Sequence, residues 1–319
     1  MSFYEVFRGP RKAFIILRSP KGMIPFTKPS IAVVGAGKVG SALALLLSRR
    51  GYIVTGVADQ SISSAKRLAG ELKVPATGNP EEITGSADIV FIATPDRVIT
   101  RVAEEISEKR GFVAGQAVFH TSGAHPAEAV GAARRSGALA ASLHPLQSFA
   151  DVKMAMENLE GSYFALEGDA GALPVAEQIV RDLGGRSFTI AAKDKPLYHA
   201  AACIASNYLV SLMHLATGLF SSFGLSRKEA FQALFPLVQG TISNIARVGP
   251  APALTGPIAR GDGTTVEGHL AAFGEVGRQE TDLYRVFGLY TIKVALEKGS
   301  IDSDQEERLK EIFEEAYIK

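Results

Sequence analysis

Three glycines near the start of the chain have the spacing and residue type needed to hold a phosphate group. Gly35, Gly37 and Gly40 form a Gly-x-Gly-x-x-Gly pattern. In a dinucleotide site the first glycine permits a tight turn, the second lets the backbone approach a pyrophosphate, and the third lets a helix pack closely on a strand. The free N–H groups at the start of that helix favour the phosphate charge. The pattern predicts a dinucleotide cradle formed by Gly35, Gly37, Lys38, Val39 and Gly40.

The residues around the glycines favour this interpretation over an ordinary tight turn. The β-branched run 31–34 comes directly before them, and an apolar stretch with helical periodicity, 41–50, follows. A second apolar run at 52–59 completes a strand–helix–strand unit of the length expected for half of a Rossmann fold. No Gly-Lys-Ser/Thr follows the glycines, which excludes a P-loop.

An acidic residue at the end of the second predicted strand bears on the choice of cofactor. Asp59 stands where a carboxylate would accept hydrogen bonds from the adenosine ribose, which favours NAD. Gln60 and Ser61 follow it, with further serines, and this polar group suits the 2′-phosphate of NADP. Both cofactors, NADP or NAD, therefore stay open.

Polar residues follow the later predicted strands at the same edge of the sheet. Strands are predicted within 87–95, 117–123 and 138–145, alternating with helical segments, which indicates a doubly wound parallel sheet. Ligands bind at the carboxyl ends of such strands. We expect cofactor contacts from Thr94, Pro95, Thr121 and Ser122, and a substrate contact from His144.

One long helix is predicted after two further strands. Residues 194–224 are apolar nearly all round and predict a helix buried at a domain or subunit interface. A polar stripe interrupts the apolar surface, and reduction of a carbonyl or imine needs a proton donor such as His or Lys beside the hydride path. The stripe supplies the candidate catalytic residues His199, Lys195 and Asn207. The alternative is that they are hydrogen-bonded core residues.

Capping patterns divide the remaining chain into helices. Ser226 with Glu229, Thr264 with Glu267, and Ser303 with Glu306 each predict a helix start. The irregular segment before Thr264 is rich in Gly and Pro and is predicted to bind substrate. Its candidate residues are Thr255, Gly256, Arg260 and Asp262.

Bulk composition narrows the class of protein. The 319 residues carry a formal net charge of +1, which favours neither nucleic acid nor an anionic membrane as partner. The single cysteine excludes intrachain disulfides and paired-cysteine zinc sites and fits a cytoplasmic location. No metal site is expected. No membrane span is expected either, because no apolar run approaches the ~20 residues of a spanning helix. The predicted organisation is a basic N-terminal extension at 1–29, a nucleotide-binding domain at 30–192 and a helical domain at 193–319.

Six motifs in order give the chain a family resemblance. "IAVVGAGKVG", "FIATPD", "FHTSGA", "SLHPLQSF", "YHAAACIASNYLVSL" and "ALTGPIARGD" together resemble NADP oxidoreductases that join a Rossmann-like domain to a helical domain of unknown function. The wider group includes 6-phosphogluconate dehydrogenase and pyrroline-5-carboxylate reductase. The resemblance covers about residues 30–290.

The resemblance implies a fold and a function. The fold is a Rossmann doubly wound sheet followed by an all-α C-terminal domain like that of 6-phosphogluconate dehydrogenase, a domain that usually forms homodimers. The implied function is NAD(P)-dependent hydride transfer to a small carbonyl or imine substrate. The loop at 255–265 departs from the substrate loop of pyrroline-5-carboxylate reductases. Because no complete known catalytic set is present, a non-catalytic NAD(P)H sensor is the alternative function.

Overall fold

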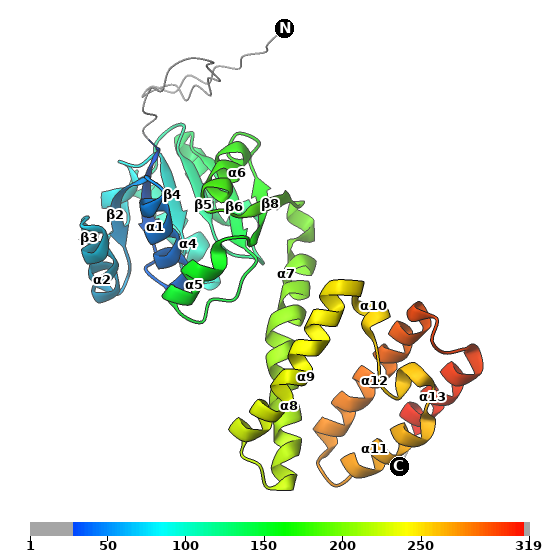
Figure 1. Ribbon diagram of the computed structural model, residues 1–319. Helices are drawn as coiled ribbons and strands as arrows, with labels where there is room; N and C mark the ends of the chain where they lie inside the picture. Colours follow the sequence, from blue (N-terminus) through cyan, green and yellow to red (C-terminus); the bar gives the residue numbers. More distant parts are fainter. Residues whose placement is uncertain (1–27, 316–319) are drawn as a thin grey trace, which may run out of the picture. The chain divides into compact units, whose positions relative to one another are not determined.

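The computed structural model describes residues 28–315 and divides into two compact units (Figure 1). The first unit extends to Ser206 and the second begins at Asn207. The predicted N-terminal extension therefore lies outside the described residues, apart from Lys28 and Pro29. The division between the units falls inside the long helix, later than the boundary expected at Lys193.

The first unit is built on one eight-stranded sheet in the order β3-β2-β1-β4-β5-β6-β7-β8. The predicted strands at 31–34, 52–59, 87–95, 117–123 and 138–145 are all present, which confirms the Rossmann-type α/β class. The strands are β1 (Ser30–Val34), β2 (Ile53–Ala58), β3 (Ala76–Thr77), β4 (Ile89–Ile92), β5 (Ala117–His120), β6 (Leu139–Pro145), β7 (Tyr163–Gly168) and β8 (Arg186–Thr189).

The sheet is not parallel throughout, unlike the predicted one. β7 pairs with β6 in the antiparallel sense, and β8 then runs parallel to β7. The connection from β6 forms α5 (Val152–Leu159) and returns to the edge it left, where Leu146 N donates to Tyr163 O at 2.8 Å. Because the chain leaves β6 and enters β7 at the same edge, the two strands must run in opposite directions.

Helices cover both faces of the sheet, because alternate residues of each strand point to opposite sides. Phe91 and Phe119 belong to an apolar core with α1 (Lys38–Arg49), α5 and α6 (Leu173–Asp182). Val90 and Val118 belong to a second core with α3 (Glu81–Thr84), α4 (Ile99–Glu108) and the 3₁₀ segment Ala127–Ser136. The helix α2 (Ile62–Leu72) packs beside β2. The polar edge of the sheet is thereby left for ligands.

The predicted long helix is present but is not buried in this chain. It runs from Ala192 to Phe223 through α7 (Lys195–Cys203), a π-helical turn (Ile204–Tyr208) and α8 (Leu209–Phe220). The helix has 32 residues, and an 18-residue window within it has a mean hydropathy of 1.3, so it is long and apolar enough, by these two measures alone, to cross a membrane. The expectation of no such run was wrong. The first turn of this helix, however, holds a buried lysine that is bonded to the sheet, as described below.

The second unit is helical, as predicted. It contains α8, α9 (Arg227–Val248), α10 (Pro250–Ala253), α11 (Gly263–Phe273), α12 (Arg278–Lys298) and α13 (Ser303–Glu315). Its core joins α11, α12 and α13 through Val266, Ile292 and Phe313. Gly288 of α12 leaves the space that the Phe313 ring occupies.

Only one of the three predicted helix caps has the expected residues. Ser226 and Glu229 form the predicted capping box of α9. At α11 the cap is Asp262, whose carboxylate accepts from Thr265 N at 3.1 Å, so the helix begins before Thr264. At α13 Asp302 takes the role predicted for Ser303, because its carboxylate accepts from Gln305 N at 2.9 Å. Aspartate and serine are both good N-caps, so the sequence alone does not choose between neighbours.

Candidate nucleotide site and proton-transfer cluster

The glycine loop has the geometry of a phosphate cradle. Gly35 follows β1 with φ +105°, a left-handed conformation that favours glycine, and a Cβ there would lie 2.6 Å from Ala93 O. A Cβ on Gly40 would overlap the carbonyl oxygen of Gly35. Gly35 and Gly40 are thus required by the fold of the loop itself.

Gly37 differs from its two neighbours because it faces open space. A Cβ at Gly37 would meet no atom within 4 Å. The residue is also the N-cap of α1, and no side chain caps this helix start. The free N–H groups of the first turn, which contains Lys38 and Val39, are therefore available to an anion. The loop fits the pyrophosphate of a dinucleotide.

A cavity of about 840 Å³ lies against this loop. Seven of the predicted cofactor residues line it: Gly35, Gly37, Asp59, Gln60, Ser61, Thr94 and Pro95. Arg101 and Glu105 of α4 also line it and form an ion pair of 3.6 Å. This pair was not predictable from the sequence, because its helix carries no recognisable nucleotide motif.

The carboxylate of Asp59 links the glycine loop to the start of α2. Its Oδ2 accepts from Ala36 N, and its Oδ1 accepts from Ser61 N, each at 2.7 Å. Ser61 Oγ in turn accepts from Ser64 N at the start of α2. A carboxylate has about four acceptor positions, so a ribose hydroxyl still finds room beside these two amides.

Thr94 offers a polar atom that the protein leaves unused. Its hydroxyl oxygen is buried without a hydrogen-bond partner among the described residues, at the wall of the cavity. An unpaired buried hydroxyl is costly, and a ligand atom would satisfy it. Thr94 therefore fits a direct contact with the bound nucleotide.

The Ser122 hydroxyl makes hydrogen bonds within the loop after β5 and to the loop after β4. It donates to Asp96 Oδ2 at 2.8 Å and accepts from Ala124 N and His125 N at 3.2 Å. Neither Thr121 nor Ser122 is among the residues that line the cavity beside the glycine loop.

Lys195 is completely buried at the start of α7. Its Nζ donates to Ser142 Oγ at 2.6 Å and to Ser122 O at 3.1 Å. Burial lowers the pKa of Lys195 to about 8, although the carboxylates of Glu167 and Asp96 act in the opposite direction. In this position the ammonium group binds β6 and the loop after β5 to the helix.

Two imidazoles converge on Gly123, one from the sheet and one from α7. A Cβ on Gly123 would lie 2.6 Å from His199 Nδ1 and 2.8 Å from His144 Nε2. The two rings meet edge to face with centroids 6.0 Å apart. His199 Nδ1 is buried without a partner among the described residues, and its Nε2 lies 3.7 Å from Cys203 Sγ. Predicted substrate and catalytic residues are thus brought together here.

Two further residues belong to this cluster, and one of them, Tyr198, was missed from the sequence. Tyr198 Oη lies 2.7 Å from His144 Nδ1. His120 accepts from Ser122 N through Nδ1 and contacts Pro126 O through Nε2, so its Nε2 carries the proton. Burial, with the nearby charge of Lys195, lowers the pKa of His120 to about 3, and the ring is neutral at physiological pH.

The remaining predicted site residues belong to the second unit. Thr255 and Arg260 are exposed, and Gly256 has φ +99°. Asp262 is engaged as the cap of α11, where its carboxylate also accepts from Thr265 Oγ1 at 2.6 Å. Asn207 is exposed at the start of this unit. Within residues 28–315 no group of three or more His, Cys, Asp or Glu is arranged to hold a metal ion.

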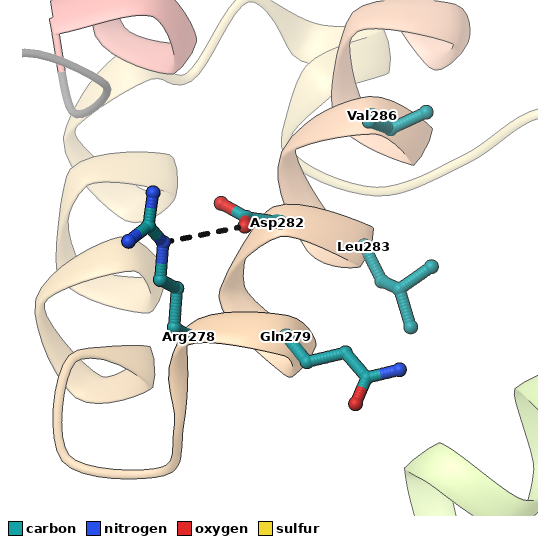
Figure 2. Close-up of a pocket in the computed structure, with 5 residues that line it drawn as sticks. All are labelled: Arg278, Gln279, Asp282, Leu283 and Val286. Atoms are coloured by element: carbon teal, nitrogen blue, oxygen red, sulfur yellow. Dashed lines mark ion pairs between the residues drawn. The ribbon is translucent and has the colours of Figure 1, made fainter.

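A second cavity, of about 460 Å³, lies on α12 (Figure 2). Its lining residues are Arg278, Gln279, Asp282, Leu283 and Val286. Figure 2 shows the Arg278–Asp282 ion pair, whose Nε and Oδ2 atoms are 3.9 Å apart, beside the exposed side chains of Leu283 and Val286. The cavity is open and mainly apolar, unlike the polar site at the sheet edge.

Comparison with known proteins agrees with this architecture. An 81-residue stretch is 41% identical to ketol-acid reductoisomerase (NADP(+)) from Xanthomonas axonopodis pv. citri, covering 25% of this chain and 23% of that protein. The chain therefore matches only about a quarter of the length of the curated relatives.

Solved structures match over much more of the chain. Protein TM1727 from Thermotoga maritima is 29% identical with a TM-score of 0.67, covering 84% of this chain and 99% of its own. Pyrroline-5-carboxylate reductase from Streptococcus pyogenes is 18% identical with a TM-score of 0.59, covering 89% and 99%. An imine reductase from Myxococcus stipitatus, in complex with NAD+, is 19% identical with a TM-score of 0.56, covering 88% and 99%.

Two family models match successive parts of the chain. A Rossmann-like domain model matches residues 19–145, and the model of DUF2520, a domain of unknown function, matches residues 162–291. The Rossmann-like match and the glycine cradle confirm the predicted cofactor class, NADP or NAD. The chain accordingly joins a Rossmann-like domain to a DUF2520 domain.

Proposed function

We propose that this protein is an NAD(P)-dependent oxidoreductase that transfers a hydride between the nicotinamide and a small carbonyl or imine substrate. The observation that carries the proposal is the open cradle at Gly37, on the same sheet edge as the imidazole cluster at Gly123. Nucleotide and proton-transfer groups at one edge are what a reductase of this fold needs. The names of the imine and pyrroline-5-carboxylate reductases with the same fold support this class.

Each part of the site has a role in this proposal. The amides near Gly37 would hold the pyrophosphate, Asp59, Gln60 and Ser61 would hold the adenosine ribose, and Thr94 would hold another part of the nucleotide. The bound nicotinamide supplies or accepts the hydride. His144 and His199 form the imidazole pair from which a proton is transferred.

Lys195 acts in this proposal through the residues that it binds. Its ammonium fixes the Ser122 carbonyl, directly before Gly123, and so sets the position of the imidazole pair. Asn207 stays a predicted catalytic residue, and Thr255, Gly256, Arg260 and Asp262 stay predicted substrate contacts.

The proposal is tested by measuring turnover with a panel of candidate substrates. The full chain is mixed with NADH or NADPH and with aldehydes, ketones, 2-oxoacids and cyclic imines, and the absorbance at 340 nm is followed. We expect oxidation of the nucleotide with at least one carbonyl or imine class. Nucleotide binding by calorimetry without turnover across the whole panel would instead indicate the non-catalytic sensor.

Removal of the His199 ring is expected to slow turnover without weakening nucleotide binding. His199→Ala should lower kcat by about 10-fold, less than the loss of a general acid, because the ring that packs against His144 is lost. The Kd for NAD(P) should be unchanged, since His199 is not among the residues lining the nucleotide cavity. The exposed His214→Ala is the matched control. Full activity in His199→Ala would make this residue purely structural.

We further propose that the second unit forms a homodimer. Leu283, Val286, Phe287 and Tyr290 lie on one stripe of α12 with 41%, 55%, 42% and 65% of their surfaces exposed. The α9 helix adds Phe231, Phe235 and Leu237, each more than 40% exposed. Exposed apolar stripes of this kind often mark interaction sites between proteins, and a two-fold pair of such surfaces is self-complementary.

A charge in this stripe is expected to break the dimer. Val286→Glu should convert a dimer into a monomer in analytical ultracentrifugation, because the carboxylate would have to be buried in an apolar interface. Glu297→Lys, on an exposed position of the same helix, should leave the dimer intact. A wild-type monomer at all concentrations would contradict the proposal.

We also propose a cytoplasmic location for the protein. The lone thiol Cys203 and the fold of the first unit are consistent with it.

A further inference from the structure

The pair formed by Tyr198 and His144 is the best-defined polar contact of the imidazole cluster. Tyr198 extends from α7 and His144 from the end of β6, and both side chains are half-buried. Tyr198 Oη and His144 Nδ1 are 2.7 Å apart, and the rings meet edge to face at 5.6 Å. The contact joins two residues 54 positions apart in the chain.

The proton positions in this pair follow from the environment. Burial raises the pKa of Tyr198 to about 12, so the phenol keeps its proton at physiological pH. Burial, followed by the charges of Lys195 and His199, lowers the pKa of His144 to about 4, while Asp96 acts in the opposite direction. His144 is therefore a neutral imidazole with a single N–H.

The hydrogen bond decides which nitrogen of His144 carries that proton. Among the described residues, His144 Nδ1 is the only hydrogen-bond partner of the Tyr198 hydroxyl. A phenol that donates to Nδ1 leaves the imidazole proton on Nε2. Nε2 is the atom that faces Gly123, where a Cβ would lie 2.8 Å away.

His199 is less well placed to give a proton. Its Nδ1 is fully buried without a partner among the described residues, and its Nε2 lies beside Cys203 Sγ. Its ring edge packs against His144 instead. Because Gly123 has no side chain, the rings of His199 and His144 can pack against each other beside it.

We propose that His144 is the catalytic proton donor, that Tyr198 is a positioning residue that also holds the replacement proton, and that Gly123 is the residue that admits both rings. This inference rests on the proposed function. As the carbonyl carbon accepts the hydride, the π electrons move to the oxygen, which takes the proton from His144 Nε2. His144 Nδ1 takes the phenolic proton at the same time. A proton from water then restores Nε2–H, and Nδ1 returns its proton to Tyr198.

The first test reads the imidazole directly and needs no substrate. Nitrogen-15 NMR of the full chain, with the His144 signals assigned by their loss in His144→Gln, should show His144 neutral between pH 6 and 8 with its proton on Nε2. Tyr198→Phe should convert this into a mixture of tautomers, because the donor to Nδ1 is gone. Tyr163→Phe is the matched control: its ring also lies beside Phe188, but its hydroxyl accepts from Arg186 at 3.2 Å.

The second test uses a carbonyl compound that the panel shows to be reduced. His144→Gln should lower kcat by about 100-fold, the lower end of the range for general acid catalysis, and Tyr198→Phe by about 10-fold. The KM of the carbonyl compound and the Kd of the nucleotide should change by less than about twofold in Tyr198→Phe, and Tyr163→Phe should behave as wild type.

The outcomes separate the two proposals. An unchanged His144 tautomer in Tyr198→Phe, or full kcat in His144→Gln, overturns the relay and leaves the proposed reductase standing. Absence of turnover across the whole panel overturns the reductase and the relay together. If His144→Gln does not fold, the Tyr198→Phe measurements decide the question by themselves.

Discussion

Gly37→Val is expected to lower the affinity for NAD(H) and NADP(H) by more than about 100-fold, or about 2.8 kcal/mol of binding free energy. The valine side chain would extend into the space that the pyrophosphate needs beside the first turn of α1. Because a Cβ at Gly37 meets no protein atom within 4 Å, the fold itself has no reason to change. Calorimetric titration with each nucleotide measures the loss, and the midpoint of thermal unfolding without nucleotide should fall only slightly, because valine is a poorer N-cap than glycine.

A matched control is available in the same domain. Gly70 on α2 is exposed, and its Cβ would also meet nothing within 4 Å, so Gly70→Val tests the effect of an added side chain away from the cavity. It should keep wild-type affinity. Equal affinities in Gly37→Val and wild type would remove the glycine loop from the nucleotide site.

Lys195→Met is expected to change how stability depends on pH. The folded pKa of about 8 is below the ordinary value of 10.5, so the unfolded chain binds more protons between these limits. The free energy of unfolding of the wild type should therefore rise with pH through this window, relative to the variant. The relative gain between pH 7 and 10.5 should be about 3 kcal/mol.

Urea unfolding at pH 7, 8, 9 and 10 measures this difference directly. Other titrating groups are shared by the two proteins and cancel. Lys193→Met, at an exposed position two residues earlier, should run parallel to wild type over the whole range. Parallel curves for Lys195→Met as well would mean that this ammonium group is not held away from water.

Local patterns were sufficient to predict most of the first unit. The β-branched run before Gly35 and the apolar runs before Thr94 and Ser122 became strands β1, β4 and β5, since buried parallel strands need continuous apolar sequence. The direction of β7 was not predictable in this way. The same apolar sequence suits a parallel or an antiparallel strand, so it does not indicate the direction of pairing. Here that direction depends on where α5 packs.

The candidate site was predictable only at the level of its parts. Helical spacing placed Lys195 and His199 on one face, but not the depth at which α7 meets the sheet. That depth buries Lys195 against Ser142 and brings Tyr198 to His144. The apolar surface of the long helix indicated that something covers it, and the sequence could not indicate what.

The two amides held by Asp59 have a consequence for changing cofactor preference by design. Replacing the acidic residue after the second strand is the obvious route from NAD toward NADP in a Rossmann domain. Here that carboxylate also fastens the glycine loop to the start of α2 through Ala36 N and Ser61 N. A redesign that removes Asp59 would loosen the pyrophosphate cradle for both cofactors. Discrimination between them is better engineered at Gln60, or at Arg101 across the cavity, with the carboxylate kept in place.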